Sequence, residues 1–390
     1  MEVDVDVVVV GAGIIGATCA AELAGAGTRV AVLEREQAPA MGSTGRSAAG
    51  VRVQFGEPTN VALSLASIEV YRTFPERHGI DVGYRPVGYL LLVPETDWAG
   101  HLGGVEIQQA MGAPVEVLDI GEARRRFVDL DPAGLAGATF GSIDGVVDPH
   151  MVTQAQLDLA RERGASVHVR HEVVEVARSG ADWLLTATAP GVGQGSERKV
   201  IRAGAVVNAA GCWSGALGRL AGLEVPVTPS RRTIWMTAPR PGRATSPLVV
   251  DLGSGVYFRS EGQRLLFGRS NPAEAPGFTT GIDWDFLEPT YEAAAARFPW
   301  FADEALDQAA CWFGYYELTP DHNAVLGANP EAHGWYDACG FSGHGVQHAP
   351  AVGRAIREEI VDGRSHTIDI DPLRLSRFAA GTRRDERHII

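Results

Sequence analysis

The sequence predicts an α/β protein of two domains, one a Rossmann-type α/β domain and the other built on a mainly antiparallel sheet. Residues 5–10 form a short β-branched run, followed at once by closely spaced glycines and then by a helical pattern. Later stretches indicate strands joined by turns, at 88–93, 233–237, 255–258 and 264–268. With 390 residues, the chain is long enough for two domains with separate cores.

The N-terminal segment has the pattern of a βαβ unit that binds a dinucleotide. Residues 5–10 predict a buried parallel strand, 17–26 a helix, and 29–33 a second strand that ends at Glu34. Three glycines in GxGxxG spacing join the first strand to the helix: Gly11, Gly13 and Gly16. The spacing alone is a weak signal, but an acid 18 residues after the last glycine completes the Rossmann fingerprint. The alternative is an ordinary βαβ unit without a ligand.

Each part of this motif has a physical role in holding a dinucleotide. Gly11 permits a tight turn, Gly13 lets the backbone approach a pyrophosphate, and Gly16 lets helix and strand pack closely. The helix N-terminus offers unpaired N–H groups and partial positive charge to the phosphates. Glu34 is expected to accept hydrogen bonds from the adenosine ribose and to repel the 2′-phosphate of NADP. The neighbouring predicted contacts are Ile14, Ile15 and Arg35.

A second segment of small residues follows at 42–50, with the sequence GSTGRSAAG. Its backbone, hydroxyls and single arginine are suited to line the far half of an extended dinucleotide, with the arginine near the phosphates. The predicted contacts here are Ser43, Thr44, Arg46, Ser47 and Ala48. An NAD enzyme has no need of a second contact so soon after the ribose acid, which favours FAD. The alternative is a plain surface loop.

Charge and cysteine content bear on the class of function. The formal net charge is −14, no basic block stands out, and Lys199 is the single lysine, so a nucleic-acid or anionic-membrane surface is not expected. The four cysteines have no CxxC spacing and predict buried thiols in a reducing compartment, with no metal site. The absence of a leader pattern and of a membrane-length apolar run predicts a cytoplasmic protein.

The joint pattern resembles the FAD-dependent amine and amino-acid oxidoreductases of the D-amino-acid oxidase superfamily. The resemblance is carried by VVVVGAGIIGATCAAELAGAG (7–27), GSTGRSAAGVRVQFG (42–56), VVNAAGCWSG (206–215), ELTPDHNAVLG (317–327) and GFSGHGVQHAPAVG (340–353). It covers nearly the whole chain. The sequence is most similar to the sarcosine oxidase and glycine oxidase branch, including the flavin subunits of sarcosine oxidase and dye-linked proline dehydrogenase complexes. The pattern is specific to the superfamily but not to one substrate.

The resemblance implies a discontinuous architecture. A Rossmann-type FAD-binding domain would comprise residues 1–80, 143–221 and 317–390, and a substrate-binding domain would comprise 81–142 and 222–316. In the first domain, Val173 or Val174 would place backbone against the adenine. A strand at 206–211 would return to the dinucleotide, and the contacts there are Ala210, Gly211 and Trp213.

The GFSGHG turn lies between an apolar run at 334–339 and a helical pattern at 351–360. In the family, this turn brings backbone N–H groups and a helix N-terminus to the pyrimidine edge of the flavin, where reduction places negative charge. The implied contacts are Gly343, His344, Gly345, Val346 and Gln347. The alternative is a glycine-rich connection that holds no ligand.

Departures from the family carry information. The cysteine that attaches flavin in monomeric sarcosine oxidases falls at Gly314, which we keep as a non-covalent contact. The histidine that attaches flavin in sarcosine and dimethylglycine dehydrogenases falls at Ser47, so the resemblance implies non-covalent FAD. The family lysine that speeds reaction with oxygen falls at Leu266, and a lysine that helps hold the substrate carboxylate falls at Gln347. Slow reaction of the reduced flavin with oxygen is therefore expected.

The predicted catalytic residues are Arg52, Tyr257, Tyr316, His344 and Arg269. Arg52 aligns with a family arginine that binds the substrate carboxylate, and a guanidinium fork suits that planar group. Arg269 is the alternate, in which case Arg52 would make a salt bridge at the surface or in the flavin loop. Tyr257 and Tyr316 match aromatic positions on the amine side, although each is also a candidate for the core. His344 is interpreted chiefly as a flavin contact.

These assignments predict FAD-dependent oxidation of the C–N bond of an amino acid or secondary amine. Hydride passes from the α-carbon to flavin N5, and the imine hydrolyses; desolvation in an aromatic pocket lowers the pKa of the amine, so no strong base is needed. The alternatives are an FAD-dependent 2-hydroxyacid dehydrogenase, with His344 or His348 as base, and a flavin-bearing non-catalytic subunit. The expected partner is a small-molecule amine or amino acid, with no nucleic acid and no membrane span. The sequence leaves open whether the protein forms a homo- or hetero-oligomer.

Overall fold

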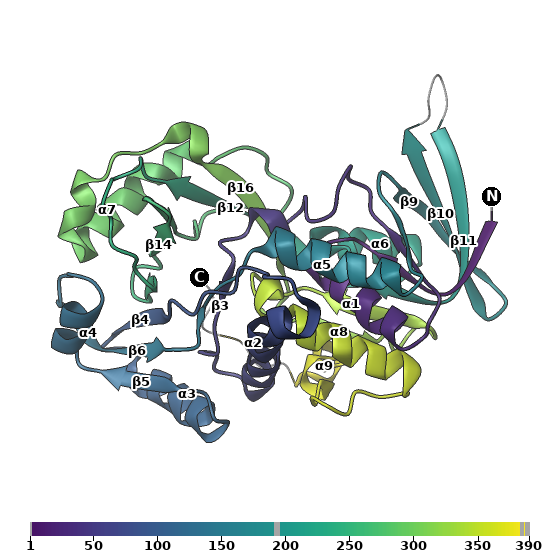
Figure 1. Ribbon diagram of the computed structural model, residues 1–390, viewed down its shortest axis with the longest axis horizontal. Helices are drawn as coiled ribbons and strands as arrows, with labels where there is room; N and C mark the ends of the chain where they lie inside the picture. Colours follow the sequence, from purple (N-terminus) through teal and green to yellow (C-terminus); the bar gives the residue numbers. More distant parts are fainter. Residues whose placement is uncertain (1, 191–195, 383–385, 387–390) are drawn as a thin grey trace.

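The computed structural model describes residues 2–190, 196–382 and 386. In Figure 1 the chain forms two sheet-based parts that lie side by side. Within the described residues there are two sheets of eight strands and a two-stranded sheet of β3 (Gly50–Val51) and β7 (Gly145–Val146). The predicted α/β fold class, with one Rossmann-type and one mainly antiparallel sheet, is confirmed.

The first large sheet is the Rossmann-type sheet. Its strands are β1 (Glu2–Val10), β2 (Val30–Leu33), β8 (Ser166–His168), β9 (Glu172–Ser179), β10 (Asp182–Pro190), β11 (Ser196–Asn208), β17 (Val325–Ala328) and β18 (Trp335–Cys339). The main path runs β17-β18-β11-β1-β2-β8, and β10 and β9 continue from β11 as an antiparallel meander. Strand β1 pairs in parallel with β2 and β11, and Val8 lies opposite Val206. Segments about 200 residues apart in the chain therefore form neighbouring strands.

The second half of β1 is buried on both faces. Val7 and Val9 belong to one apolar core, whereas Val8 and Val10 belong to the core on the opposite face. This explains why residues 7–10 form a continuous β-branched run, whereas Asp4 and Asp6 alternate with valines in the less buried first half of the strand.

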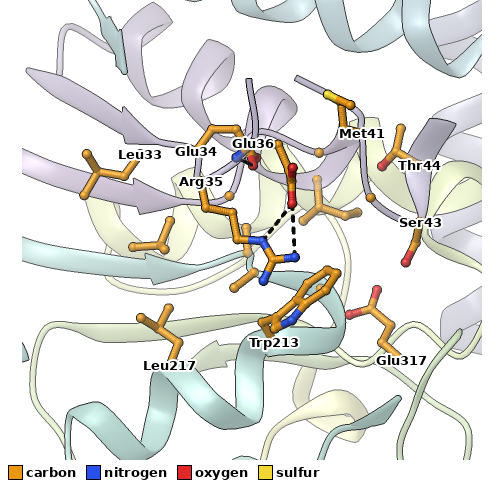
Figure 2. A pocket seen from close by; sticks show the side chains of 18 of the residues that line it. Leu33, Glu34, Arg35, Glu36, Met41, Ser43, Thr44, Trp213, Leu217 and Glu317 are labelled. Carbon is orange, nitrogen blue, oxygen red and sulfur yellow. Dashed lines mark hydrogen bonds and ion pairs between the residues drawn. The ribbon is translucent and has the colours of Figure 1, made fainter. Parts of the chain in front are cut away.

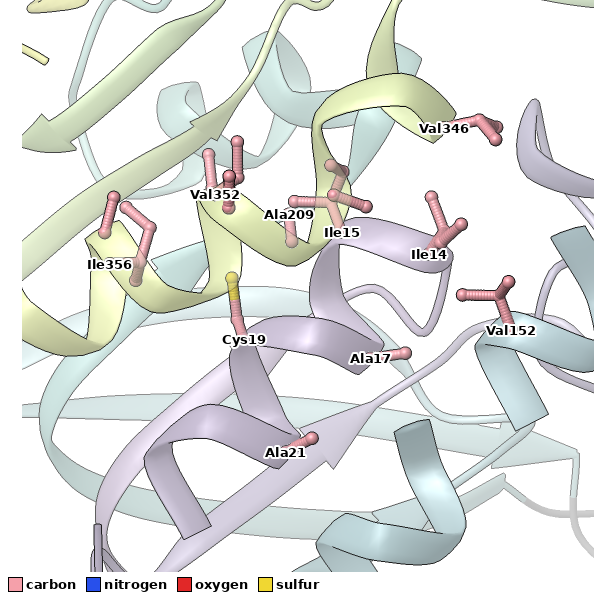
Figure 3. Packing of buried hydrophobic residues seen from close by; sticks show 14 of the residues in the cluster. Ile14, Ile15, Ala17, Cys19, Ala21, Val152, Ala209, Val346, Val352 and Ile356 are labelled. Carbon is pink, nitrogen blue, oxygen red and sulfur yellow. The ribbon is translucent and has the colours of Figure 1, made fainter. Parts of the chain in front are cut away.

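Helices lie on both faces of this sheet, because Leu217 packs with Val8 and Val10 on the face opposite the other helices. The helices of this part are α1 (Ile14–Gly25), α2 (Pro58–His78), α5 (Pro149–Glu162), α6 (Ser214–Leu220), α8 (Gly345–Val361) and α9 (Arg377–Ala380). Helix α1 contacts α5 and α8, and α2 contacts α8. Figure 3 shows Cys19 of α1 pointing toward Val352 and Ile356 of α8. A Cβ added at Gly353 would lie 2.8 Å from the carbonyl group of Thr18, so this glycine lets the two helices approach closely.

The second large sheet has the order β16-β12-β15-β14-β13-β4-β6-β5. Its strands are β4 (Tyr89–Pro94), β5 (Val115–Leu118), β6 (Leu135–Gly141), β12 (Thr228–Met236), β13 (Leu248–Asp251), β14 (Tyr257–Glu261), β15 (Arg264–Gly268) and β16 (Trp312–Leu318). Only β4 and β13 pair in parallel among its described strands. Its helices are α3 (Trp98–Ala110), α4 (Ile120–Arg126) and α7 (Leu287–Arg297).

The two faces of this sheet belong to different apolar clusters. Leu90 and Phe258 pack with Phe298 on one face, whereas Tyr89 and Tyr257 lie on the other. Short 3₁₀ helices occur at η1 (Thr44–Arg46), η2 (Gly211–Trp213), η3 (Trp284–Phe286), η4 (Pro299–Asp303), η5 (Gln308–Ala310) and η6 (Asp371–Leu373). Strand β16 crosses the boundary expected between residues 316 and 317, so one continuous strand serves both parts. Within the described chain, no helix combines the length and apolar character needed to cross a membrane.

Candidate functional site

The carboxyl ends of the parallel strands open into a cavity of about 800 Å³, here called the main cavity. Val10 ends β1 and Leu33 ends β2, and both line it together with Ala209, which follows β11. Ligands of open α/β sheets bind at this edge, and the volume lies within the range of about 300–1,000 Å³ typical of cofactor sites. The sequence-predicted residues that line it are Gly11, Gly13, Ile14, Ile15, Glu34, Arg35, Ser43, Thr44, Arg46, Val173, Val174, Ala210, Gly211 and Trp213.

The three glycines of the motif stand in different surroundings. A Cβ at Gly11 would lie 2.3 Å from the carbonyl oxygen of Ala209, and one at Gly16 would lie 1.9 Å from the carbonyl oxygen of Gly11. Both positions therefore serve close packing, and Gly16 does not line the cavity. A Cβ at Gly13 would meet only Thr44 Oγ1, at 3.1 Å. Gly13 is thus the glycine whose small size leaves backbone open toward the cavity.

Glu34 and the two residues after it form one wall of the main cavity. Glu34 accepts hydrogen bonds from the backbone N–H of Ala12 and of Glu36, each at 2.8 Å, which fix its carboxylate at the cavity wall. Arg35 lies over the Trp213 ring at 3.6 Å and forms an ion pair with Glu36 at 3.1 Å (Figure 2). The segment thus presents an acid and a flat cationic–aromatic surface.

The hydroxyl-rich loop connects the Rossmann part to β16. Ser43 Oγ donates to the carbonyl of Tyr315 at 2.7 Å, and Thr44 Oγ1 accepts from the backbone N–H of Ile14 at 3.1 Å. Arg46 donates to the carbonyl of Phe313 at 3.3 Å. The loop is therefore fixed both to α1 and to β16, and its arginine lines the main cavity.

A second, smaller cavity of about 60 Å³ lies where the two parts meet. The sequence-predicted residues that line it are Ser47, Ala48, Arg52, Tyr257, Tyr316, Gly343, His344, Val346 and Gln347. Tyr89 and Leu248 of the second sheet line it too. Its volume is below the range of ligand pockets, so binding here requires side chains to move. The residues aligned with flavin-edge and substrate positions are nevertheless brought together.

Arg52 is buried in this second cavity, with 1% of its surface exposed. Its backbone N–H donates to Gln347 Oε1 at 3.1 Å, its guanidinium donates to the carbonyl of Gln54, and it lies 4.0 Å from the Phe55 ring. Burial lowers the pKa of Arg52, but a guanidinium remains charged in a protein. The site thus holds a cation with little water around it.

The carboxyl of Asp144 supports the strand that carries Arg52. It accepts from the backbone N–H of Val53 at 2.8 Å and from Gln54 Nε2 at 2.9 Å. Burial raises the pKa of Asp144 to about 6, with these hydrogen bonds and Arg52 acting in the opposite direction. Arg52 is therefore positioned by a hydrogen-bonded network rather than by a direct ion pair with this acid.

Two phenols form the aromatic wall of the second cavity. Burial raises the pKa of Tyr257 and of Tyr316, so both are neutral near pH 7. Arg232 lies 4.7 Å from the Tyr316 ring. A Cβ at Gly343, where φ is +99°, would lie 2.6 Å from that ring, so the GFSGHG turn needs glycine to pack against the phenol.

The GFSGHG turn starts α8, with His344 as its N-cap residue. The His344 ring packs edge-to-face on Phe55 at 4.8 Å. His348 lies outside the second cavity, with Nε2 at 3.1 Å from Ser64 Oγ, and burial lowers its pKa to about 3. It is a buried neutral imidazole at the interface of α8 with α2.

In addition to Gly16, three predicted residues line neither of the two cavities, namely Gly314, Gly345 and Arg269. Gly345 is the first residue of α8, and a Cβ at Gly314 would lie 3.0 Å from Arg46 Cβ. Arg269 follows the end of β15; its Nε donates to the carbonyl of Ser254 at 2.7 Å, and its Nη1 to that of Pro289 at 3.3 Å. The structure therefore does not bring Arg269 to Arg52.

Strand β16 separates the two cavities, and this alternation reveals residues that sequence reasoning missed. Phe313, Tyr315 and Glu317 line the main cavity, whereas Tyr316 lines the second. Successive side chains of a strand point to opposite faces. The period of two in β16 therefore turns Glu317 away from Tyr316 and toward the main cavity. Tyr89 carried no comparable local signal.

The comparisons with known proteins agree with this geometry. The family described as FAD dependent oxidoreductase matches residues 6–359. The chain belongs to this family. The predicted membership of the D-amino-acid oxidase superfamily is confirmed, and FAD is the cofactor.

Relatives of this FAD-dependent oxidoreductase cover nearly its whole length. FAD-dependent oxidoreductase domain-containing protein 1 of Bos taurus is 34% identical over 430 residues, which cover 99% of the chain and 87% of the bovine protein. Among solved structures, L-proline dehydrogenase from P. horikoshii has a TM-score of 0.88 and 28% identity, covering 98% of this chain and 100% of its own. Glycine oxidase from Geobacillus kaustophilus has a TM-score of 0.80 and 28% identity, covering 96% and 99%.

The residues present fit FAD. The uncrowded Gly13, the N-terminus of α1 and the Ser43 and Thr44 hydroxyls suit a diphosphate. Among residues 2–190, 196–382 and 386, no group of three or more His, Cys, Asp or Glu side chains is arranged to hold a metal ion. That FAD is bound without a covalent bond stays a prediction, drawn from Gly314 and Ser47.

Proposed function

We propose that this oxidoreductase oxidises the C–N bond of an amino acid or a secondary amine. The observation that carries the proposal is the second cavity, which combines the buried Arg52 with the phenols Tyr257 and Tyr316. A guanidinium suits a carboxylate, and aromatic rings suit an amine. The names of two similar structures, L-proline dehydrogenase and glycine oxidase, support an amino-acid substrate.

The chemistry that bound FAD would supply is acceptance of the hydride that leaves the substrate α-carbon. Arg52 would hold the carboxylate and so fix which carbon is presented, with Gln347 and Gln54 holding the arginine through the contacts described above. The neutral phenols would surround the amine without adding charge. A poorly hydrated pocket disfavours the ammonium form, so the amine enters neutral and needs no strong base. The imine product would then hydrolyse, or persist if cyclic.

The test is anaerobic reduction of the flavin by an amino acid and by the matching amine that lacks the carboxylate. Arg52→Ala should lower kcat/KM for the amino acid by roughly 30- to 1000-fold, about 2–4 kcal/mol, and affect the amine much less. Arg269→Ala is the matched control, because that arginine lies outside both cavities, and it should leave both substrates unaffected. Equal losses on the two substrates in Arg52→Ala would show that Arg52 organises the flavin loop instead.

A further inference from the structure

One acid in the main cavity has no role in the proposed reaction. Glu317 lies on β16, and its carboxyl points into the cavity toward Ser43 (Figure 2). The side chain is partly exposed, and the surface it exposes lines the cavity. A bound cofactor would therefore cover it and remove its water.

The surroundings of Glu317 contain hydrogen-bond donors but no neighbouring cation. Its Oε2 accepts from the backbone N–H of Gly340 at 2.9 Å. Within the described part of the chain, no Arg, Lys or His nitrogen forms an ion pair with it. Glu317 acts electrostatically on two thiols: Cys212 of η2, whose pKa burial raises to about 12, and Cys339 of β18, whose pKa burial also raises. The other charged or acidic side chains that line the same cavity are Glu34, Arg35, Glu36, Arg46 and Glu172. Asp337, two residues before Cys339 on β18, raises the pKa of Cys339, as Glu317 does.

Burial raises the pKa of Glu317 to about 7, although the backbone N–H groups of Gly340 and Phe341 act to lower it. Near neutral pH the carboxyl is therefore divided between its two forms. A ligand that covers the Glu317 carboxyl favours either its protonated or its ionised form. FAD carries two negative charges on its diphosphate, so its field and the lost hydration both disfavour the carboxylate.

We propose that Glu317 binds FAD as the neutral carboxylic acid, donating its O–H to an oxygen of the cofactor while its other oxygen keeps the Gly340 N–H. One proton is then taken up for each FAD bound whenever the free protein holds the carboxylate. FAD affinity consequently falls as the pH rises through the neutral range, approaching tenfold for each pH unit.

The experiment measures the Kd of FAD for apoprotein, by quenching of flavin fluorescence, from pH 6 to pH 9. Wild-type Kd should rise about 50-fold between pH 7 and pH 9. Glu317→Gln keeps a donor and cannot ionise, so it should bind like wild type at pH 6 and change less than about 3-fold to pH 9. Glu36→Gln removes an acid from the same cavity and should keep the wild-type slope.

A second measurement needs no variant. Mixing FAD with wild-type apoprotein in weakly buffered solution should take up close to one proton per FAD at pH 8 and almost none at pH 6. An unchanged slope in Glu317→Gln would assign the titration to another group and overturn the proposal. Equal weakening of that variant at pH 6 and pH 9, or no proton uptake at pH 8, would overturn it as well.

Discussion

Replacing two neighbouring glycines one at a time should separate the folding role of the GxGxxG motif from its cofactor role. At Gly11, φ is +106° and an added Cβ would lie 2.3 Å from the Ala209 carbonyl oxygen. The backbone strain costs about 1–3 kcal/mol and the forced contact about 1–3 more. Gly11→Ala should therefore lower the free energy of unfolding of the apoprotein by about 2–6 kcal/mol.

The size of the chain converts this loss into a melting temperature. Unfolding entropy is roughly 2.1 cal/mol/K per residue, so 390 residues correspond to roughly 0.8 kcal/mol/K. The apoprotein Tm of Gly11→Ala should fall by about 2–7 °C, measured by thermal scanning without added FAD. In the protein that remains folded, the free energy of FAD binding should change less than the free energy of unfolding does.

Gly13→Ala is the matched comparison, because its Cβ would touch only the Thr44 hydroxyl and its φ is −73°. Losing glycine at this N-cap position costs at most about 1 kcal/mol, so the apoprotein Tm should change by about 1 °C. The new methyl group instead enters the cavity, and the Kd of FAD should rise by roughly tenfold or more, about 1.4 kcal/mol. Equal Tm losses in the two variants, or wild-type FAD affinity in Gly13→Ala, would refute the assignment.

Three further outcomes are expected. Glu34→Arg should lose FAD occupancy, since hydrogen bonds to a charged group are worth about 1.5–3 kcal/mol, and normal flavin absorbance in the purified variant would count against it. Acid precipitation should leave the flavin in the supernatant, because Gly314 and Ser47 offer no attachment atom of the family type; yellow pellets would contradict this. Substrate-reduced enzyme should react slowly with oxygen and fast with a dye. Leu266 lies in the same buried cluster as Tyr257. The variant Leu266→Lys should accelerate the reaction with oxygen up to about 100-fold, because a cation near the flavin contributes about 3 kcal/mol. An unchanged stopped-flow rate in this variant would contradict the reasoning.

Local motifs predicted the cofactor half of the site because their constraints are local. The positive φ of Gly11, the uncrowded Gly13 and the acid at Glu34 all follow from one βαβ unit. The same holds for the GFSGHG turn, whose Gly343 must avoid the Tyr316 ring.

The substrate half depended on tertiary pairing that no local pattern encodes. Tyr89 reaches the second cavity because β4 pairs with β13, a segment about 160 residues later. Arg269 was expected there as an alternate, but β15 ends at Gly268, so strand alternation no longer governs where the arginine points. Glu317 was within reach of sequence reasoning, since the period of two in β16 places it opposite Tyr316.

The pairing of β1 with β11 has a consequence for how the protein is made. Translation at about 5–20 residues per second means that β1 leaves the ribosome roughly 10–40 s before its neighbour β11 is complete. The lining of the main cavity also includes residues of β16 and β18, so a chain that ends before Ala338 does not present all of it. Nascent chains are therefore expected to rely on protection of an unpaired apolar strand, and FAD, which binds only the finished fold, pulls the folding equilibrium forward by mass action. Flavin supply would then set the yield of this protein as well as its activity.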